Sequence, residues 1–191
     1  MIDFTYQKDR YLTYDNEVIS DASVDEDHPV RMIGSEIVGH LHRVVVMPKG
    51  DRVFIIGGSM YTNGVNPLNQ TIMLTKEENG KFSCVKKSSM HAPRSAFGVA
   101  MYPSFKQIFV VGGSIGENDV TKTCERYIIE DDIWKRLPEL NEPKGSASVC
   151  FFNKGSSIYC FGGIIKNSEG ILQATDSIER LSKGENYWKK L

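Results

Sequence analysis

The sequence carries almost no excess charge. Its 23 lysines and arginines stand against 24 acidic residues, a formal net charge of −1, and no block of five or six like charges occurs. We therefore expect neither nucleic acid nor an anionic membrane as a partner. No apolar run approaches the ~18 residues that cross a bilayer. The N-terminal MIDFTYQKDRY also lacks the apolar core of a signal peptide, so export by that route is not expected.

Cysteine is sparse and shows no functional spacing. Cys84, Cys124, Cys150 and Cys160 form no CxxC pair and no Cys/His zinc pattern. The last three lie in strand-like runs, where a free thiol behaves as a small buried hydrophobe. The pattern indicates a reducing compartment, and a cytoplasmic location is the expectation.

Groups that carry catalysis are also scarce. His40 and His42 lie two residues apart on a predicted strand, a spacing that would suit a metal, but the sequence assigns no third ligand. Ser95 and Ser146 are not part of a GxSxG elbow. The glycine pairs open no helix, so a phosphate-binding loop is not indicated either. We expect no enzyme activity, no metal and no cofactor.

What the sequence does contain is a repeat. Three apolar runs, RVFIIGG, QIFVVGG and SIYCFGG, each end in a glycine doublet, and the first glycines lie 55 and then 50 residues apart. Each run follows another apolar segment across a short polar turn: HRVVVM, FGVAMY and SVCFFN. The doublets are Gly57-Gly58, Gly112-Gly113 and Gly162-Gly163.

Two further segments follow each doublet after a variable loop. In ERYIIEDDIW, Tyr127 lies seven residues before Trp134, and in ERLSKGENYW, Leu181 lies seven residues before Trp188. Each copy is thus four short runs rich in Val, Ile, Phe and Tyr, split by turn residues. No segment sustains a helical period, so the sequence predicts an all-β protein.

The physics of small sheets explains the repeat. A four-stranded sheet cannot bury both faces alone, so such sheets stack on their neighbours around an axis. A tryptophan on the outer strand fills the widening gap between sheets, and the glycines turn the chain with positive φ. In the first copy Leu74 and Phe82 take the places of tyrosine and tryptophan, with one extra residue between them. The Glu-Arg pair of the third strand is expected to tie neighbouring loops together.

This pattern resembles the Kelch repeat, which builds β-propeller blades of about 50 residues. The last copy keeps Pro143, the doublet and Trp188 but has Lys144 for arginine and Leu181 for tyrosine, and the first keeps the doublet and apolar strands. The middle copy matches best, at Pro93, Arg94, Gly112, Gly113, Tyr127 and Trp134.

The resemblance implies one continuous domain of about 3.5 blades, while propellers close with about 4–8. Residues 37–90, 91–141 and 142–191 are the predicted blades. Residues 1–36 are predicted as the outer strands of a preceding blade plus an acidic loop; a non-repeat strand pair or a disordered tail is the alternative. The chain could be part of a longer ring, a small closed ring, or one of two chains that assemble together. We favour an incomplete propeller, either a fragment or a protein that associates with itself through its open blade faces.

In this family, residues at the start of the innermost strand line the propeller mouth, where peptide-binding members hold acidic motifs. The resemblance implies a positive rim from Arg94 and Lys144, because arginine pairs bidentately with carboxylates. The alternative for Arg94 is a salt bridge within its own blade. The variable loops SMYTNGVNPLNQ, SIGENDVTK and IIKNSEGILQATD form a second candidate surface. The predicted mouth residues are Arg94, Ser95, Lys144, Ser146, His40 and His42.

The function that the resemblance implies is a non-catalytic protein–protein interaction module. Kelch propellers serve as substrate-recognition domains of ubiquitin-ligase adaptors, as actin binders and as cytoplasmic scaffolds. Two alternatives stay open from the sequence. One is an enzyme of the Kelch-propeller kind, an oxidase or a sugar-converting enzyme. The other is a truncated copy without independent activity.

Overall fold

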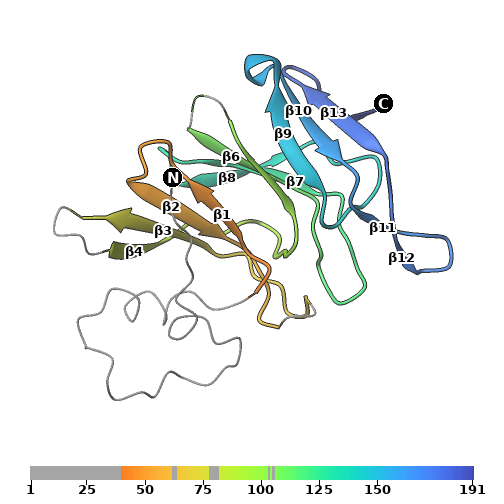
Figure 1. Ribbon diagram of the computed structural model, residues 1–191, viewed down its shortest axis with the longest axis horizontal. Coiled ribbons are helices and arrows are strands. Elements are labelled where there is room, and N and C mark those ends of the chain that lie inside the picture. The colour runs from red at the N-terminus through yellow and green to blue at the C-terminus, as the bar shows by residue number, and fades with distance from the viewer. Residues whose placement is uncertain (1–39, 62–63, 78–81, 103, 105) are drawn as a thin grey trace, which may run out of the picture.

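The computed structural model describes residues 40–191 except 62–63, 78–81, 103 and 105. The strands predicted for residues 1–36 lie outside the described residues. Three four-stranded antiparallel sheets and one two-stranded hairpin make up the described fold (Figure 1), with a single 3-10 turn at Asn153–Gly155. The predicted all-β class is confirmed. In the part of the chain that the structure describes, no helix is long and apolar enough to span a membrane.

Each sheet is an antiparallel meander of four strands, interrupted in the last sheet by a separate hairpin between its second and third strands. The first sheet contains β1 (Arg43–Val46), β2 (Arg52–Ile56), β3 (Thr71–Lys76) and β4 (Phe82–Lys87). The middle sheet contains β5 (Gly98–Met101), β6 (Gln107–Val111), β7 (Cys124–Ile128) and β8 (Ile133–Leu137). The last sheet contains β9 (Ser148–Phe152), β10 (Ser157–Phe161), β13 (Ile178–Ser182) and β14 (Lys189–Lys190).

One hairpin was not predicted. The segment between β10 and β13, expected to be a variable loop, contains β11 (Ile164–Lys166) paired with β12 (Leu172–Ala174). Its turn is held by the Asn167 side chain, which accepts hydrogen bonds from the backbone N–H groups of Glu169 and Ile171. Such local side-chain bonds are typical of asparagine in turns.

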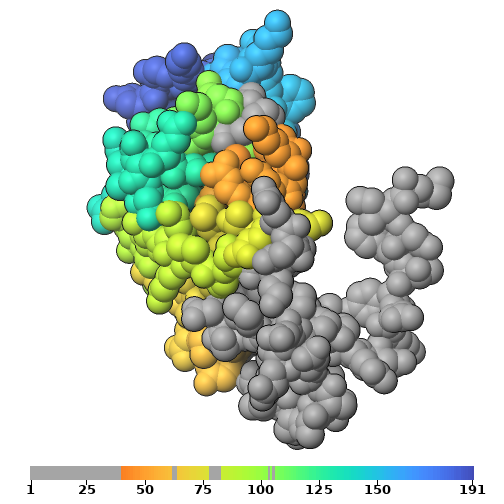
Figure 2. Space-filling model, turned by 90° about the vertical axis from the view of Figure 1, so that its left-hand side faces the viewer, coloured from red at the N-terminus to blue at the C-terminus, as the bar shows by residue number. Residues whose placement is uncertain are grey.

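The sheets stack face to face, and each pair encloses a core. One cluster, including Phe54, Ile108 and Tyr127, fills the space between the first and middle sheets. A second, including Phe109, Ile158 and Leu181, fills the space between the middle and last sheets. Figure 2 shows the same order on the surface, with blue residues of the last sheet at the top and yellow residues toward the bottom.

The two tryptophans join adjacent sheets, as predicted. Trp134 Nε1 donates to the Ser88 carbonyl oxygen at 2.9 Å and lies 3.2 Å from Thr71 Oγ1, and both partners belong to the first repeat. Trp188 Nε1 donates to the Pro138 carbonyl oxygen of the middle repeat at 2.9 Å. Each indole therefore packs against the preceding sheet while its N–H group stays satisfied.

The assignment of Phe82 to the tryptophan position is wrong. In the middle sheet Tyr127 pairs with Trp134, but in the first sheet Leu74 pairs with Cys84, and Phe82 lies opposite Lys76. The cause is the longer connection between β3 and β4: the partner of Leu74 lies ten residues later in the chain, two more than the eight that we expected. A shift of two keeps a residue on the same face, so the sequence pattern alone did not reveal it.

The first two glycine doublets lie where the next repeat approaches closely. All six glycines have positive φ, as predicted, for example +61° at Gly112 and +116° at Gly113. A Cβ atom on Gly112 would lie 2.3 Å from the Lys144 carbonyl oxygen. The Gly113 N–H group donates to that same oxygen at 2.7 Å. These glycines thus provide both the turn and the space for a backbone contact between repeats.

A second contact between repeats uses residues other than glycine. Leu41, Ala96 and Ser146 occupy matching positions and have φ values of 56°, 45° and 51°. The Ala96 N–H group donates to the Leu41 carbonyl oxygen at 3.1 Å, and Ser146 N–H donates to the Ala96 carbonyl oxygen at 2.7 Å. This chain of bonds links the segments that lead into the three innermost strands, β1, β5 and β9. No sequence pattern predicted these bonds, because residues other than glycine rarely adopt this backbone region.

Candidate binding surface

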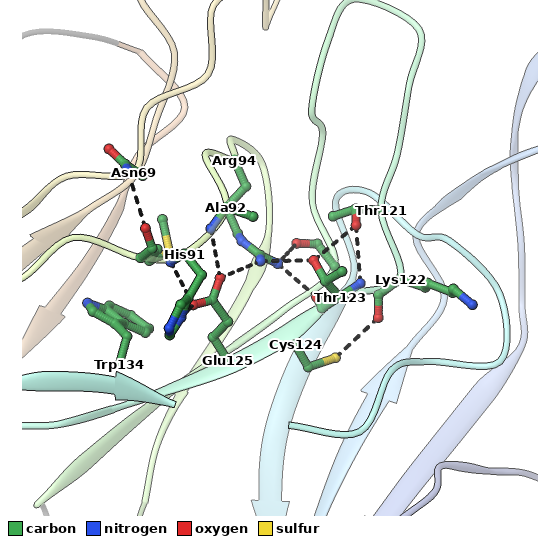
Figure 3. Close-up of polar contacts among 12 residues, drawn as sticks. Asn69, His91, Ala92, Arg94, Thr121, Lys122, Thr123, Cys124, Glu125 and Trp134 are labelled. Carbon is green, nitrogen blue, oxygen red and sulfur yellow. Dashed lines mark hydrogen bonds and ion pairs between the residues drawn. The ribbon is translucent and has the colours of Figure 1, made fainter. Parts of the chain in front are cut away.

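The Arg94 side chain lies inside the protein. It is 0% exposed and comes from the segment that enters β5. Its guanidinium donates to the carbonyl oxygens of Gly112 and Thr123 at 2.8 and 2.7 Å, and to Glu125 Oε1 at 2.8 Å (Figure 3). The planar fork of arginine suits this arrangement, because it serves a carbonyl pair and a carboxylate at once.

Glu125 on β7 completes the arrangement. Its Oε2 atom accepts hydrogen bonds from the His91 N–H group at 2.9 Å and lies 2.6 Å from His91 Nδ1, and Oε1 accepts from the Ala92 N–H group at 3.2 Å. Burial alone would raise the pKa of Glu125, but the bonds from His91 and the charge of Arg94 hold it below its ordinary value. The carboxylate therefore stays charged and fixes the segment His91 to Arg94. The tie that we expected from the Glu-Arg pair is made by the glutamate.

The last repeat has the same design. Lys144 and Glu179 are both 0% exposed, with Nζ and Oε1 3.0 Å apart. Asn141 replaces His91: its N–H group and its side-chain amide donate to Glu179 Oε2 at 2.8 and 2.7 Å. In the first sheet the matching position holds Ile72, which is 2% exposed and carries no charge.

These positions correct the expected positive rim. Arg94 and Lys144 are buried, and the structural salt bridge, left open as the alternative for Arg94, is what the structure contains. Ser95 is buried too, whereas Ser146 is exposed. The physical reason is that a charged side chain at a strand start can reach the acid of its own sheet before it reaches solvent.

The two histidines predicted at the mouth are half-buried and already engaged. The backbones of His40 and Ser59 exchange two hydrogen bonds of 2.6 Å. His40 and His42 both have interaction partners within the chain. Among the described residues, no group of three or more His, Cys, Asp or Glu side chains could hold a metal ion.

The second candidate surface does form. The loops after β2, β6 and β10 extend from the same end of the three sheets (Figure 1). Lys166 Nζ of the last loop pairs with Asp119 Oδ1 of the middle loop at 2.7 Å. A Cβ atom on Gly64 in the first loop would lie 3.7 Å from the Gly116 carbonyl oxygen, so the first and middle loops also lie side by side. We call this face the loop surface.

Large apolar side chains are exposed on the loop surface. Met60 and Tyr61 of the first loop are 40% and 52% exposed, Ile115 of the middle loop is 45% exposed, and Ile171 of the last is 58% exposed. Exposed apolar side chains on loops of a rigid scaffold are typical of interaction sites. The sequence analysis predicted these loops as a binding surface but did not identify these residues. An apolar residue soon after a glycine doublet is the sequence pattern that could have identified them.

Comparisons with known proteins agree with the repeat. A model of the Kelch motif matches residues 106–141. The chain is 26% identical over 178 residues, 87% of its length, to "Kelch repeat and BTB domain-containing protein 2" of Ectromelia virus (strain Moscow). It spans 29% of that relative's length, so the relative is more than three times as long as the matched region. These matches support the Kelch-repeat family that the sequence predicted.

A solved structure shows a similar fold. A fungal alcohol oxidase of the AA5 family, in complex with copper, matches with a TM-score of 0.60 and 16% identity over 66% of this chain and 27% of the oxidase chain. At that identity the likeness concerns the fold alone. The three sheets are blades of a Kelch-type β-propeller, in which the Arg94–Glu125 and Lys144–Glu179 pairs lie inside the blades.

Proposed function

We propose that the chain is a non-catalytic, protein-binding part of a Kelch propeller and that its partner docks on the loop surface. The observation that carries the proposal is the set of exposed apolar side chains on three adjacent loops, headed by Tyr61 and Ile115. Aromatic and large apolar residues in the centre of an interface supply most of its binding energy. The family's general role in protein–protein interaction supports this reading.

The buried ion pairs change the kind of partner that we expect. With Arg94 and Lys144 inside the blades, the predicted cations for an acidic peptide are not exposed. The remaining lysine of the last loop, Lys166, is paired with Asp119. The partner should therefore present an apolar patch rather than a purely acidic motif. A substrate-recognition or scaffold role within a longer protein follows as the finer part of this proposal.

Association through the open blade faces is a further part of the proposal. On the face of the last sheet directed away from the middle sheet, Phe152 is 57% exposed, and its ring contacts Tyr159, which stacks on Phe161. The occupant that we propose for this face is the same face of a second copy of the chain. A solution molar mass of two chains, reduced to that of one chain by Phe152→Glu, would support that assignment, and a molar mass of one chain for the wild type would overturn it.

The loop surface is tested by charge insertion. We expect Tyr61→Glu combined with Ile115→Glu to abolish recovery of partners that the wild type enriches from a cell extract. Ile133→Glu is the matched control, because Ile133 is 38% exposed on β8, at the opposite end of the middle sheet. Recovery of the same partners by the doubly substituted variant would overturn the loop surface as the binding site.

A cytoplasmic location and the lack of catalysis belong to the same proposal. The four cysteines are free, which supports a reducing compartment. The oxidase alternative has support only at the level of fold. Metal analysis of purified protein distinguishes the two: stoichiometric copper or zinc would favour a metal-dependent enzyme.

A further inference from the structure

A cleft of about 410 Å³ lies between the middle and last blades. Strands β6 and β7 line one side, and β10, β13 and the turn at residues 182–185 line the other. This turn and the one between β9 and β10 lie at the end of the last blade opposite the β11–β12 hairpin (Figure 1), so the cleft is separate from the loop surface. Its volume falls within the range of about 300–1,000 Å³ that is typical of small-ligand sites.

The first reason for the cleft is a smaller residue in the last blade. At the interface between the first two blades, Tyr127 fills the matching volume and is 0% exposed. The centroid of its ring lies 5.1 Å from that of Trp134 and 5.9 Å from that of Phe54. Leu181 occupies that position in the last blade, since it pairs with Ile158 as Tyr127 pairs with Ile108. The shorter side chain leaves the space of a ring unfilled.

The facing wall also differs from its counterpart. In the first blade Met73 pairs with Phe54, and in the middle blade Arg126 takes the same place opposite Phe109. An apolar side chain is thus replaced by a cation at the interface where the volume opens. Two independent changes, at Leu181 and Arg126, convert a filled core contact into a cleft with a positive group.

The protein provides few hydrogen-bond acceptors for the Arg126 guanidinium. Its Nε atom is buried and has no hydrogen-bond partner among the described residues, and Nη1 makes a long contact of 3.4 Å to Gln107 Oε1. A guanidinium has five N–H donors, and a buried donor without an acceptor is costly. The carboxylate in the lining, that of Glu185, accepts from the Ser182 N–H group at 2.9 Å and pairs with Arg180 at 3.5 Å. The Arg126 guanidinium can therefore donate hydrogen bonds to an external anion.

The remaining walls suit an apolar group. The rings of Tyr102, Phe109 and Phe151 pack against one another, with centroids 5.0–6.2 Å apart. Two of the three contacts are edge-to-face. Aromatic rings in such a cage contact another planar apolar group favourably. Lys183 at the rim is exposed and adds positive charge near the opening.

We propose that this cleft binds a carboxylate carried on a short apolar or aromatic body. The guanidinium of Arg126 holds the carboxylate through its free donors, and the three rings enclose the apolar part. One half-buried guanidinium balances one negative charge and matches a planar carboxylate bidentately, which favours a carboxylate over a doubly charged phosphate. A free organic acid and the C-terminus of a peptide both offer this chemistry.

Phenylacetate is the probe, titrated into the chain while the amide NMR signals are recorded. We expect saturable shifts at cleft residues, weaker or no shifts with neutral phenylacetamide, and none of comparable affinity with inorganic phosphate. A short peptide that ends in phenylalanine, with a free or an amidated C-terminus, separates the two sources. Tighter binding of the free peptide acid than of phenylacetate would identify a peptide; tighter binding of phenylacetate would identify a small acid.

Two variants come from the chain's own repeats, so each carries a residue that this fold accepts elsewhere. Arg126→Met should weaken phenylacetate binding about tenfold or more, because a charge-assisted hydrogen bond is lost. Leu181→Tyr should close the cleft and abolish binding while the fold is kept. Arg136→Met, at an exposed cation of β8 outside the lining, should leave the affinity unchanged.

Three results would overturn the proposal. They are no saturable shift in the wild type, equal affinities for phenylacetate and phenylacetamide, and unchanged affinity in Arg126→Met. The signals of the loop surface report on folding in each variant. If Arg126→Met loses its folded signals, Leu181→Tyr alone decides the matter, and undiminished binding by that variant would overturn the proposal.

Discussion

Lys144 and Glu179 form an ion pair inside the last blade, with Nζ and Oε1 3.0 Å apart and both side chains fully buried. Arg94 and Glu125 repeat this relationship in the middle blade at 2.8 Å. In both, a base at the entrance to the innermost strand meets an acid of the third strand. Such pairs are costly to bury, and removing one partner leaves an uncompensated charge. The pairs fix the chain at the point where one blade passes to the next.

Removal of one partner should be strongly destabilising. Glu125→Ala leaves the Arg94 guanidinium buried without its carboxylate, and we expect a loss of about 3–5 kcal/mol in the free energy of unfolding. Chemical denaturation measures it. Glu130→Ala is the control, because Glu130 is 65% exposed in its pair with Lys106 and should cost at most about 1 kcal/mol. A loss at Glu125 no larger than at Glu130 would mean that the pair does not hold the blade.

A double substitution separates the pair from the packing around it. Arg94→Met with Glu125→Leu removes both charges, so the double variant should lose clearly less stability than the sum of the two single variants. Strict additivity in this double-mutant cycle would show that the two side chains are energetically independent.

Glu125 should also make stability depend on pH in the acid range. Its folded pKa is lowered from the ordinary value of 4.5, so the folded state binds this proton less readily than the unfolded state. Its contribution is therefore complete above about pH 4.5 and is lost as the pH falls towards the lower, folded pKa. The unfolding free energy of Glu125→Gln, measured over the same range, should fall less steeply than that of the wild type. Parallel curves would contradict the prediction.

The glycine doublet gives a steric prediction. Gly112→Ala requires a side chain at φ +61°, and its Cβ atom would lie 2.3 Å from the Lys144 carbonyl oxygen. Gly50→Ala is matched in backbone strain, with φ +67°, but nothing lies within 4 Å. We expect about 1–2 kcal/mol of strain in both and a further loss in Gly112→Ala from the displaced carbonyl. Equal melting temperatures for the two variants would contradict the close approach of the blades.

The architecture was readable from the sequence because it depends on regular spacing. Glycine doublets 50 to 55 residues apart, and an aromatic seven residues before Trp134, predict strands, turns and stacking without knowledge of distant contacts. The β11–β12 hairpin was missed because its three-residue strands and polar turn resemble a loop. The register of Phe82 was missed because a hairpin can lengthen by two residues without changing the apolar face.

The site was harder to read. Arg94 and Lys144 stand at the family's mouth positions, but whether they reach solvent depends on Glu125 and Glu179, which lie 31 and 35 residues later in the chain. A charge-reversal test of Arg94 and Lys144 would therefore unfold the blades rather than report on binding. The exposed side chains of the loop surface depend on loop conformation, which composition does not determine.

The most direct test of the stacked blades is the free energy of unfolding of Trp134→Ala. The Trp134 ring is 6% exposed and donates its N–H to the preceding repeat, so its removal should cost about 3–5 kcal/mol. Ile133→Ala on the same strand, 38% exposed, is the control and should cost about 0.5 kcal/mol or less. A loss below about 1 kcal/mol at Trp134 would place the indole in solvent and contradict the arrangement of blades on which the loop surface and the cleft both depend.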